Sequence, residues 1–264
     1  MKPNRKFTEG RIFNSLFSLA FPIILANILQ SAYQLVDTFW LGRLGANAVA
    51  AVSISFPLLF LVLSLGSGLT LAGTVLVSQA YGAEEHKRVD FNSSQTISLI
   101  FFISLMLSVL SYFAAGPLMR LIGAGPEIYN DSVSYFQVSS LGFVFLFMFF
   151  AFQSLMRGIG NVMLPVYIVL GTVFLNLILD PLFIYGYGPV PGFGVAGAAV
   201  ASIITQAISA AIGLWILFRG KSGIKIYFSQ MRPHYSTLKK IVILGIPASI
   251  EQSTRALGMA FMVL

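Results

Sequence analysis

Residues 49–80 read VAAVSISFPLLFLVLSLGSGLTLAGTVLVSQA, an apolar run that contains no Asp, Glu, Lys or Arg. An α-helix needs about 20 mostly apolar residues to cross the hydrocarbon core of a membrane, and this run exceeds that length. Six further apolar stretches satisfy the same requirement. The sequence therefore predicts seven membrane-spanning helices, which cover residues 15–40, 49–80, 91–115, 132–155, 163–185, 195–218 and 238 onward.

The composition of the chain also indicates an all-α integral membrane protein. Of its 264 residues, 57% are hydrophobic and 9% are charged, whereas soluble domains carry about 25% charged residues. The absence of cysteine excludes disulfides, thiolate metal sites and cysteine nucleophiles. We attribute the net charge of +7 to basic loops that fix membrane topology rather than to a nucleic-acid partner.

Basic residues divide unevenly between the two sides of the predicted membrane. Thirteen of the 16 Lys and Arg residues fall in the N-terminal segment or in loops on the same side, whereas the opposite loops hold only Arg43 and Arg120. Cytoplasmic loops carry an excess of Lys and Arg. The sequence therefore predicts a multi-pass protein of the plasma (inner) membrane with a cytoplasmic N-terminus.

A short internal repeat suggests two related halves. The segment LAFP at 19–22 corresponds to LGIP at 244–247, with an offset of 225 residues, and both prolines stand early in an apolar span. Transporters often contain such parallel repeats. We expect a six-helix lobe over residues 1–220, a cytoplasmic linker over 221–237, and the truncated first helix of a second lobe over 238–264. The full-length protein is then expected to be about twice the offset in length.

Three of the nine acidic residues lie inside predicted spans: Asp37, Asp180 and Glu251. An ionisable side chain in a span costs at least about 2.5–3.5 kcal/mol and marks a candidate functional site. Asp37 and Asp180 fall at a similar depth in the outer half of the membrane, given the helical rise per residue. Each has a polar residue four positions earlier on the same helical face, Tyr33 and Asn176 respectively.

Polar residues of other spans reach the same depth, so one polar cluster around the two acids is expected. These residues are Ser202, Tyr135, Gln137 and Ser139. Two carboxylates in a low-dielectric cavity can hold a proton and release it when water or a cation enters, which suits proton or sodium coupling. The alternative is that both acids are helix-end residues that reach for water, since Asp180 precedes Pro181, where a helix tends to stop.

Glu251, Pro22 and several glycines allow structural as well as functional interpretations. Arg255 follows Glu251 at the spacing of a helical ion pair, so a neutralised pair competes with a cation-coupling role. Pro22 removes a backbone hydrogen bond and can bend the first span, or it serves packing alone. Small residues such as Gly68 and Gly197 are interpreted as points of close helix contact.

No enzyme signature is present in the sequence. His86 and His234 lie in loops without metal-ligand spacing, and no nucleotide-binding loop or Gly-x-Ser-x-Gly elbow occurs. We therefore expect a protein that is not an enzyme and has no cofactor and no metal site.

Six motifs resemble those of the multidrug and toxic compound extrusion (MATE) transporters, and in particular the DinF-like, archaeal-type branch. They occur in order along nearly the whole chain: FPII at 21–24, VDTFWLGRLG at 36–45, VSQAYGA at 77–83, RGIGN at 157–161, NLILDPLF at 176–183 and GVAGAA at 194–199. The resemblance implies a twelve-helix transporter of two six-helix lobes, monomeric at full length, which exports amphipathic, cationic organic compounds by alternating access in exchange for H⁺ or Na⁺.

The resemblance also implies roles for individual residues. Asp37 and Asp180 match the cation-coupling acids of the DinF-like branch, and Pro22 matches the proline at which the first helix bends. Glu251 lies near an acid of the NorM branch and is a candidate second cation site. The supporting polar cluster and substrate cavity are expected to contain Tyr33, Tyr135, Asn176 and Ser202.

Two other functions stay open at this point. A lipid-linked oligosaccharide flippase of the same superfamily would favour a more cationic cavity, but the first six predicted spans contain no Lys or Arg. A non-transporting membrane scaffold, or an intramembrane enzyme, comes from a different class. The missing catalytic constellation argues against the enzyme.

Overall fold

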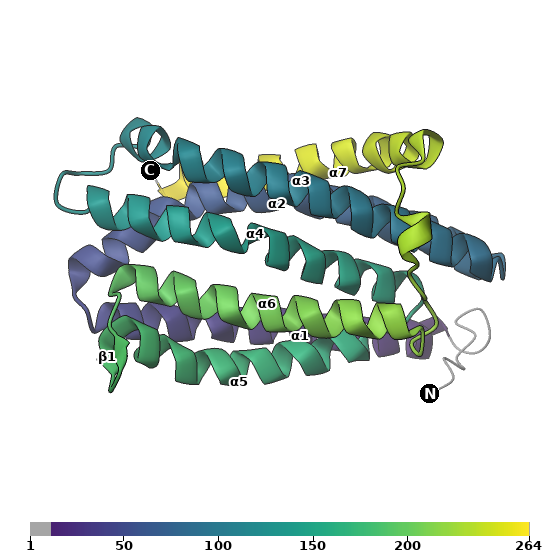
Figure 1. Ribbon diagram of the computed structural model, residues 1–264, viewed down its shortest axis with the longest axis horizontal. Helices are drawn as coiled ribbons and strands as arrows, with labels where there is room; N and C mark the ends of the chain where they lie inside the picture. The colour runs from purple at the N-terminus through teal and green to yellow at the C-terminus, as the bar shows by residue number, and fades with distance from the viewer. Residues whose placement is uncertain (1–11, 264) are drawn as a thin grey trace.

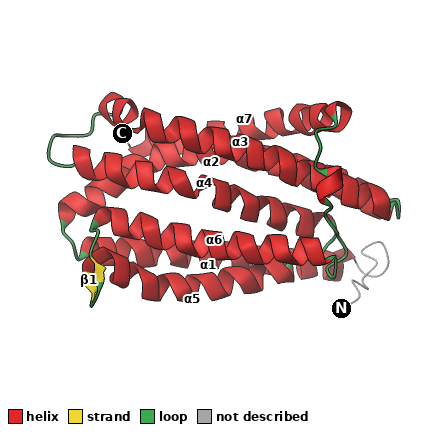
Figure 2. Cartoon of the chain, in the orientation of Figure 1, coloured by secondary structure: helices red, strands yellow, loops and turns green. Residues whose placement is uncertain are grey.

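The computed structural model describes residues 12–263, with side chains described for Phe17 and for residues 20–254 apart from Val190. Long α-helices occupy nearly all of this range (Figures 1 and 2). They are α1 (Ile12–Gly42), α2 (Ala46–Gly82), α3 (His86–Leu121), α4 (Tyr129–Gly158), α5 (Met163–Tyr185), α6 (Val195–Arg219) and α7 (Tyr235–Val263).

The all-α fold is confirmed, and a helix covers each of the seven predicted spans. Helices α2 to α6 are long and apolar enough to cross a membrane by length and composition. The fifth span, Met163–Tyr185, has the predicted bounds, and most others extend a few residues further because helices continue past the hydrocarbon core. The predicted end of the third span at residue 115 is wrong: α3 continues through Pro117 to Leu121, since a proline forfeits one helical hydrogen bond without forcing the helix to end.

Helix α4 lies in the middle of the bundle and packs against α2, α3 and α6. On one side of it α1 packs mainly against α5, and α5 packs against α6; on the other side α7 packs against α2 (Figure 1). Helix α1 makes only minor contacts with α2 and α6. This arrangement leaves room between α1 and the central helices, while holding α1 closely to α5.

Close helix contacts explain two of the predicted small residues. A Cβ atom at Gly68 of α2 would overlap the backbone nitrogen of Ser249 on α7, and a Cβ at Gly197 of α6 would overlap the carbonyl of Phe183 on α5. Glycine lets two helix backbones approach more closely than any other residue does. The packing interpretation is therefore confirmed at both positions.

Two connections complete the fold. The predicted turn after α5 forms a short antiparallel pair, β1 (Gly186–Tyr187) with β2 (Val190–Pro191), before α6 begins. The connection from α6 to α7 contains one 3₁₀ turn, η1 (Phe228–Gln230). Its residues Ile224 and Ile226 are buried in the main hydrophobic core, so this segment is part of the folded lobe.

Candidate functional site

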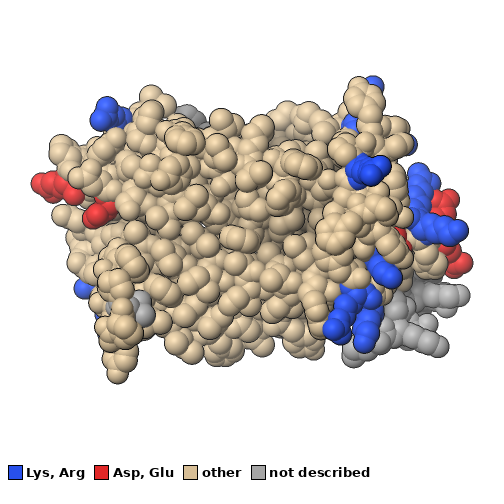
Figure 3. Space-filling view, in the orientation of Figure 1, with Lys and Arg blue, Asp and Glu red and all other residues tan. Residues whose placement is uncertain are grey.

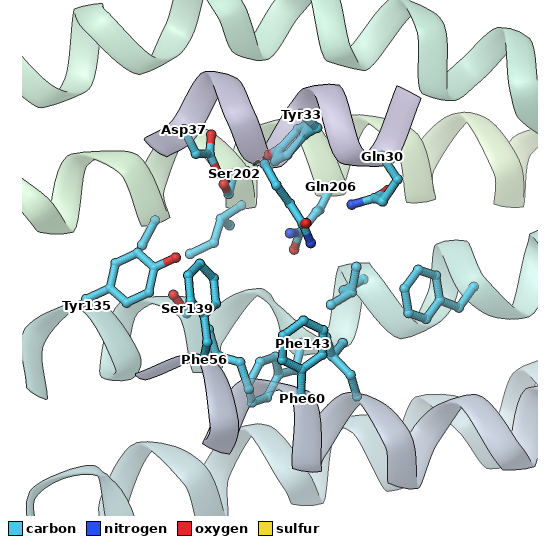
Figure 4. Close-up of a pocket in the computed structure, with 17 residues that line it drawn as sticks. Gln30, Tyr33, Asp37, Phe56, Phe60, Tyr135, Ser139, Phe143, Ser202 and Gln206 are labelled. Carbon is cyan, nitrogen blue, oxygen red and sulfur yellow. Dashed lines mark hydrogen bonds between the residues drawn. The ribbon is translucent and has the colours of Figure 1, made fainter. Parts of the chain in front are cut away.

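A cavity of about 150 Å³ lies between α1, α2, α4 and α6 (Figure 4). One part of its wall is polar and the other is aromatic or aliphatic. The polar residues are Gln30, Tyr33, Gln34 and Asp37 of α1, Tyr135 and Ser139 of α4, and Ser202 and Gln206 of α6; the principal apolar residues are Phe56, Leu59, Phe60 and Leu63 of α2 and Phe143, Leu146 and Phe150 of α4.

The polar residues of α1 face the aromatic residues of α2 across the cavity (Figure 4). Figure 4 shows Asp37, Tyr33 and Gln30 projecting from α1 on one side, with Phe56 and Phe60 on the other. Asp37 is the only formally charged side chain among the described residues that line the cavity, and no described Lys or Arg lines it. A cavity of this kind suits an amphipathic molecule that is neutral or positively charged, because polar groups orient a ligand while apolar walls bury it.

The polar wall of α1 follows directly from residue spacing. Gln30, Tyr33, Gln34 and Asp37 recur at intervals of three or four residues, and residues at these intervals lie on one face of an α-helix. The opposite face of α1 exposes large apolar residues such as Ile28 and Leu35. The helix therefore presents one polar stripe, and the packing of the bundle turns that stripe toward the cavity.

Behind Asp37, the contact between α1 and α5 brings the two predicted acids together. Asp180 is fully buried, and its Oδ1 accepts a hydrogen bond of 2.9 Å from Nδ2 of Asn176. The carboxyl group of Asp37 interacts with both Asp180 and Asn176. The expectation that these residues form one cluster agrees with their placement, and Asp37 stands between the cavity and the buried pair.

Three buried oxygen atoms of this cluster have no hydrogen-bond partner among the described residues: Oδ1 of Asp37, Oδ2 of Asp180 and Oδ1 of Asn176. All three are acceptors, and an ionised carboxylate has no proton to donate. A buried polar atom left without a partner costs about 1–3 kcal/mol. The cluster thus contains buried acceptor atoms without donors, and binding of a proton or a hard cation would satisfy them.

Tyr33 does not bond to Asp37 as its position on the same helical face suggested. Its hydroxyl donates to Oγ of Ser202 at 2.9 Å and lies 3.1 Å from Oγ1 of Thr205, both on α6. The phenol side chain of Tyr33 therefore links α1 to α6. Ser202 and the buried Tyr135 do line the cavity, as expected.

Other predicted residues lie elsewhere. Gln137 faces α3, where its Nε2 lies 3.4 Å from the carbonyl oxygen of Tyr112, so its expected place in the cluster is wrong. Pro22 is buried within an α1 that continues through it, and its bending role stays a prediction. Glu251 is exposed on α7 and is not among the residues that line the cavity; the side chain of Arg255 is outside the described residues.

Sequence reasoning missed three glutamines and a threonine at this site: Gln30, Gln34, Gln206 and Thr205. The first two lie on the same helical stripe as Tyr33 and Asp37, so the spacing around Asp37 held a usable signal. Neutral amides in a membrane span are less conspicuous than carboxylates. Gln206 and Thr205 follow Ser202 by about one turn of α6, and the same rule would have found them.

Comparison with known proteins places this architecture in a family. The MatE family model matches residues 22–182. "Probable multidrug resistance protein YoeA" of Bacillus subtilis is 30% identical over 94% of this chain and 54% of its own length. "Probable multidrug resistance protein YpnP" of the same organism is 30% identical over 96% and 56%, respectively.

A solved structure gives the same result at the level of the fold. It is described as the outward-facing conformation of a multidrug resistance MATE family transporter of the MOP superfamily. It matches with a TM-score of 0.85 and 25% identity over 92% of this chain and 53% of that one. The chain thus spans about half the length of the relatives it matches, and its assignment to the DinF-like branch stays a prediction. With a family match over more than half of its residues, the chain belongs to the MatE (MATE) family of membrane transporters.

Proposed function

We propose that the chain is part of a secondary active exporter of amphipathic organic cations, which works by alternating access as an antiporter of H⁺ or Na⁺. In this proposal residues 1–220 form the N-terminal lobe, residues 221–237 link the lobes, and residues 238–264 begin the second lobe. The names of the bacterial relatives, which describe multidrug resistance proteins, support the substrate class.

The unsatisfied oxygens around Asp37 carry the proposal. Asp37, Asp180 and Asn176 together present three buried acceptor atoms without a described donor. A proton shared between the carboxylates would supply one donor and remove one negative charge. Oxygen ligands of this kind are also those that hard metal cations prefer, so the same cluster suits Na⁺.

The position of Asp37 supports exchange rather than independent binding. Its side chain lines the cavity and also interacts electrostatically with the buried Asp180–Asn176 pair. A positively charged substrate in the cavity and a coupling cation in the cluster would therefore compete for one carboxylate. Competition for a shared charge is the simplest physical basis for antiport, because entry of one cation favours release of the other.

Charge distribution supports the proposed orientation of the chain in the inner membrane. Figure 3 shows Lys and Arg side chains gathered mainly at one end of the molecule, near the α2–α3 turn and the α6–α7 connection, with few at the other end. The broad surface between the two ends shows almost none on this face. Under the positive-inside rule, the basic end, at which α1 begins (Figure 1), is cytoplasmic.

Neither alternative function gains support from the site. A flippase for lipid-linked oligosaccharides would be favoured by basic residues for the phosphate groups, and no described Lys or Arg lines the cavity. A scaffold would have no need for two acids buried together, which are costly in a membrane.

The test is gradient-driven efflux of a fluorescent organic cation by the full-length protein in liposomes. We expect Asp37→Asn and Asp180→Asn each to reduce efflux at least about tenfold, the effect of about 1.4 kcal/mol. Asp131→Asn, an exposed acid in the first turn of α4, is the matched control and should transport normally. A proton gradient and a sodium gradient, imposed separately, identify the coupling ion. Unchanged efflux in both the Asp37→Asn and the Asp180→Asn variant would refute the mechanism.

A further inference from the structure

The connection between α6 and α7 forms an ordered surface segment, residues 220–234, which we call the strap. Its side chains alternate: Ile224 and Ile226 are buried in the core, whereas Lys225 and Tyr227 between and after them are exposed. Alternation with a period of two is the pattern of an extended chain that lies on a surface. The strap therefore has an inner apolar face and an outer face that carries charged and aromatic groups.

Polar side chains of α3 hold the strap through its backbone. Asp90 Oδ1 accepts from the Lys225 N–H at 2.8 Å, and Gln95 Oε1 accepts from the His234 N–H at 3.0 Å. Ser98 Oγ donates to the carbonyl oxygen of Met231 at 2.9 Å. Because these bonds use backbone groups of the strap, the outward-facing side chains of the strap keep their own donors for other partners.

Cations and aromatic rings gather where the strap leaves α6. The guanidinium of Arg219 lies 4.2 Å from the ring centre of Trp215, and the ammonium of Lys225 lies 5.0 Å from that of Tyr227. A Cβ at Gly220 would lie 2.9 Å from the Lys225 side chain, so Lys225 runs past the end of α6, next to the residue that follows Arg219 in the chain. Trp215 is 55% exposed, which leaves this cluster open to its surroundings.

Phe228 extends the same surface. It stacks on Phe218 with ring centres 4.6 Å apart, yet it is 75% exposed. Trp and Tyr concentrate at the interface between lipid and water, and Trp215 and Tyr227 of this surface are both exposed. Since α6 is a candidate span that ends at Arg219, the strap lies at the level of the lipid headgroups.

The basic residues at this end of α6 are not needed to satisfy the last backbone carbonyls of the helix. The last carbonyls of that helix already accept backbone hydrogen bonds, from Gly220 to Ile216 and from Ile226 to Leu217. Asp90 interacts electrostatically with Lys225, whereas the ion pair between Arg88 and Glu85 lies at the start of α3 and does not involve the strap. Residues 219–240 contain six Lys and Arg and no Asp or Glu, so the strap has a net positive field.

We propose that the strap and the end of α6 bind the headgroup of an anionic phospholipid, with Arg219 and Lys225 on the phosphate and Trp215 and Phe228 at the acyl boundary. Basic side chains close to a membrane surface attract anionic lipids. Exposed rings provide the apolar contact that a soluble anion does not need, which favours a lipid over free phosphate. The proposed cation cluster around Asp37 lies apart from this surface and plays no part in it.

The test measures which lipid the purified protein retains from an equimolar mixture of phosphatidylglycerol and phosphatidylcholine. We expect a preference for phosphatidylglycerol of about fivefold for each basic side chain engaged, which declines as salt is raised. The double variant Arg219→Gln/Lys225→Gln should lose most of it. The matched control, Arg43→Gln/Arg120→Gln, removes two cations from the opposite end and should keep it.

Further variants and ligands separate the effect of charge from that of folding, and the binding of a lipid from the binding of a free anion. The variant Arg219→Lys/Lys225→Arg retains both charges and should retain the preference, so a loss there would overturn the proposal. Equal retention of the two lipids by the unmodified protein, or an unchanged preference in the Gln double variant, would also overturn it. A rise in melting temperature with inorganic phosphate equal to that with phosphatidylglycerol would show a general anion site instead.

Discussion

The side chain of Gln95 is the largest single polar contribution to the attachment of the strap. It is fully buried on α3. Its amide nitrogen donates to the carbonyl oxygens of Gln230 and Arg232, and its carbonyl oxygen accepts from the His234 N–H. We predict that Gln95→Leu, which is similar in size but cannot form hydrogen bonds, detaches this part of the strap from α3.

The magnitude follows from the groups left behind. Three backbone groups lose their partner, and each buried polar group without one costs about 1–3 kcal/mol. Arg232 and His234 are exposed at the surface, so water will replace part of the loss. We therefore expect local opening of the strap to become easier by about 2–4 kcal/mol, which corresponds to about 30- to 700-fold faster exchange of the protected amides.

Hydrogen exchange measured by mass spectrometry on the purified protein tests this directly, because it reads peptides of the strap separately from those of the helices. The matched control is Gln137→Leu on α4, a half-buried amide with a single long contact of 3.4 Å to α3. It should leave exchange in the strap unchanged. If Gln95→Leu and Gln137→Leu had the same small effect on the strap, the assignment of its stability to Gln95 would be refuted.

Two further predictions concern helix packing. Gly68→Val should destabilise the protein by about 1–3 kcal/mol, because its side chain would overlap the backbone at Ser249 and separate α2 from α7; Gly171→Ala, which meets nothing within 4 Å, should be neutral or stabilise by up to about 1 kcal/mol. Equal melting temperatures of the two variants would contradict this. Tyr33→Phe removes two hydrogen bonds to α6 and should lower the unfolding free energy by about 1–2 kcal/mol, as measured by denaturant titration in detergent.

The sequence predicts the helices well because the membrane imposes a strict rule on composition and length. A run such as residues 163–185 has to span the hydrocarbon core, and its predicted bounds match α5. The acids Asp37 and Asp180 were also identifiable, because a charge is rare and costly at that depth. Their acidic side chains identify them in the sequence, and the packing of α1 against α5 brings them together.

Contacts that depend on the direction in which a side chain points could not be predicted from residue types. The hydroxyl of Tyr33 could have faced Asp37 or α6, and only the packing of α1 beside α6 decides between them. In the sequence, the buried face of α3 that holds the strap looks like an ordinary polar stretch before a span. Its hydrogen-bond partners are backbone atoms more than 130 residues away in the chain. Because backbone groups are the same for nearly all residue types, the sequence of the strap does not indicate that it binds to α3.

Helix α1 connects the two parts of the proposed mechanism. It carries Asp37 into the acid cluster and Gln30, Tyr33 and Gln34 into the cavity wall, while its contacts with α2 and α6 are few. A change in the charge state of the cluster therefore acts on the same helix that supplies half of the polar residues lining the cavity. Such a movement of α1 relative to α6 would break the bonds from Tyr33 to Ser202 and Thr205. At about 0.5–1.5 kcal/mol each, they are weak enough to be broken by binding of one coupling cation, and strong enough to hold α1 in place between transport events.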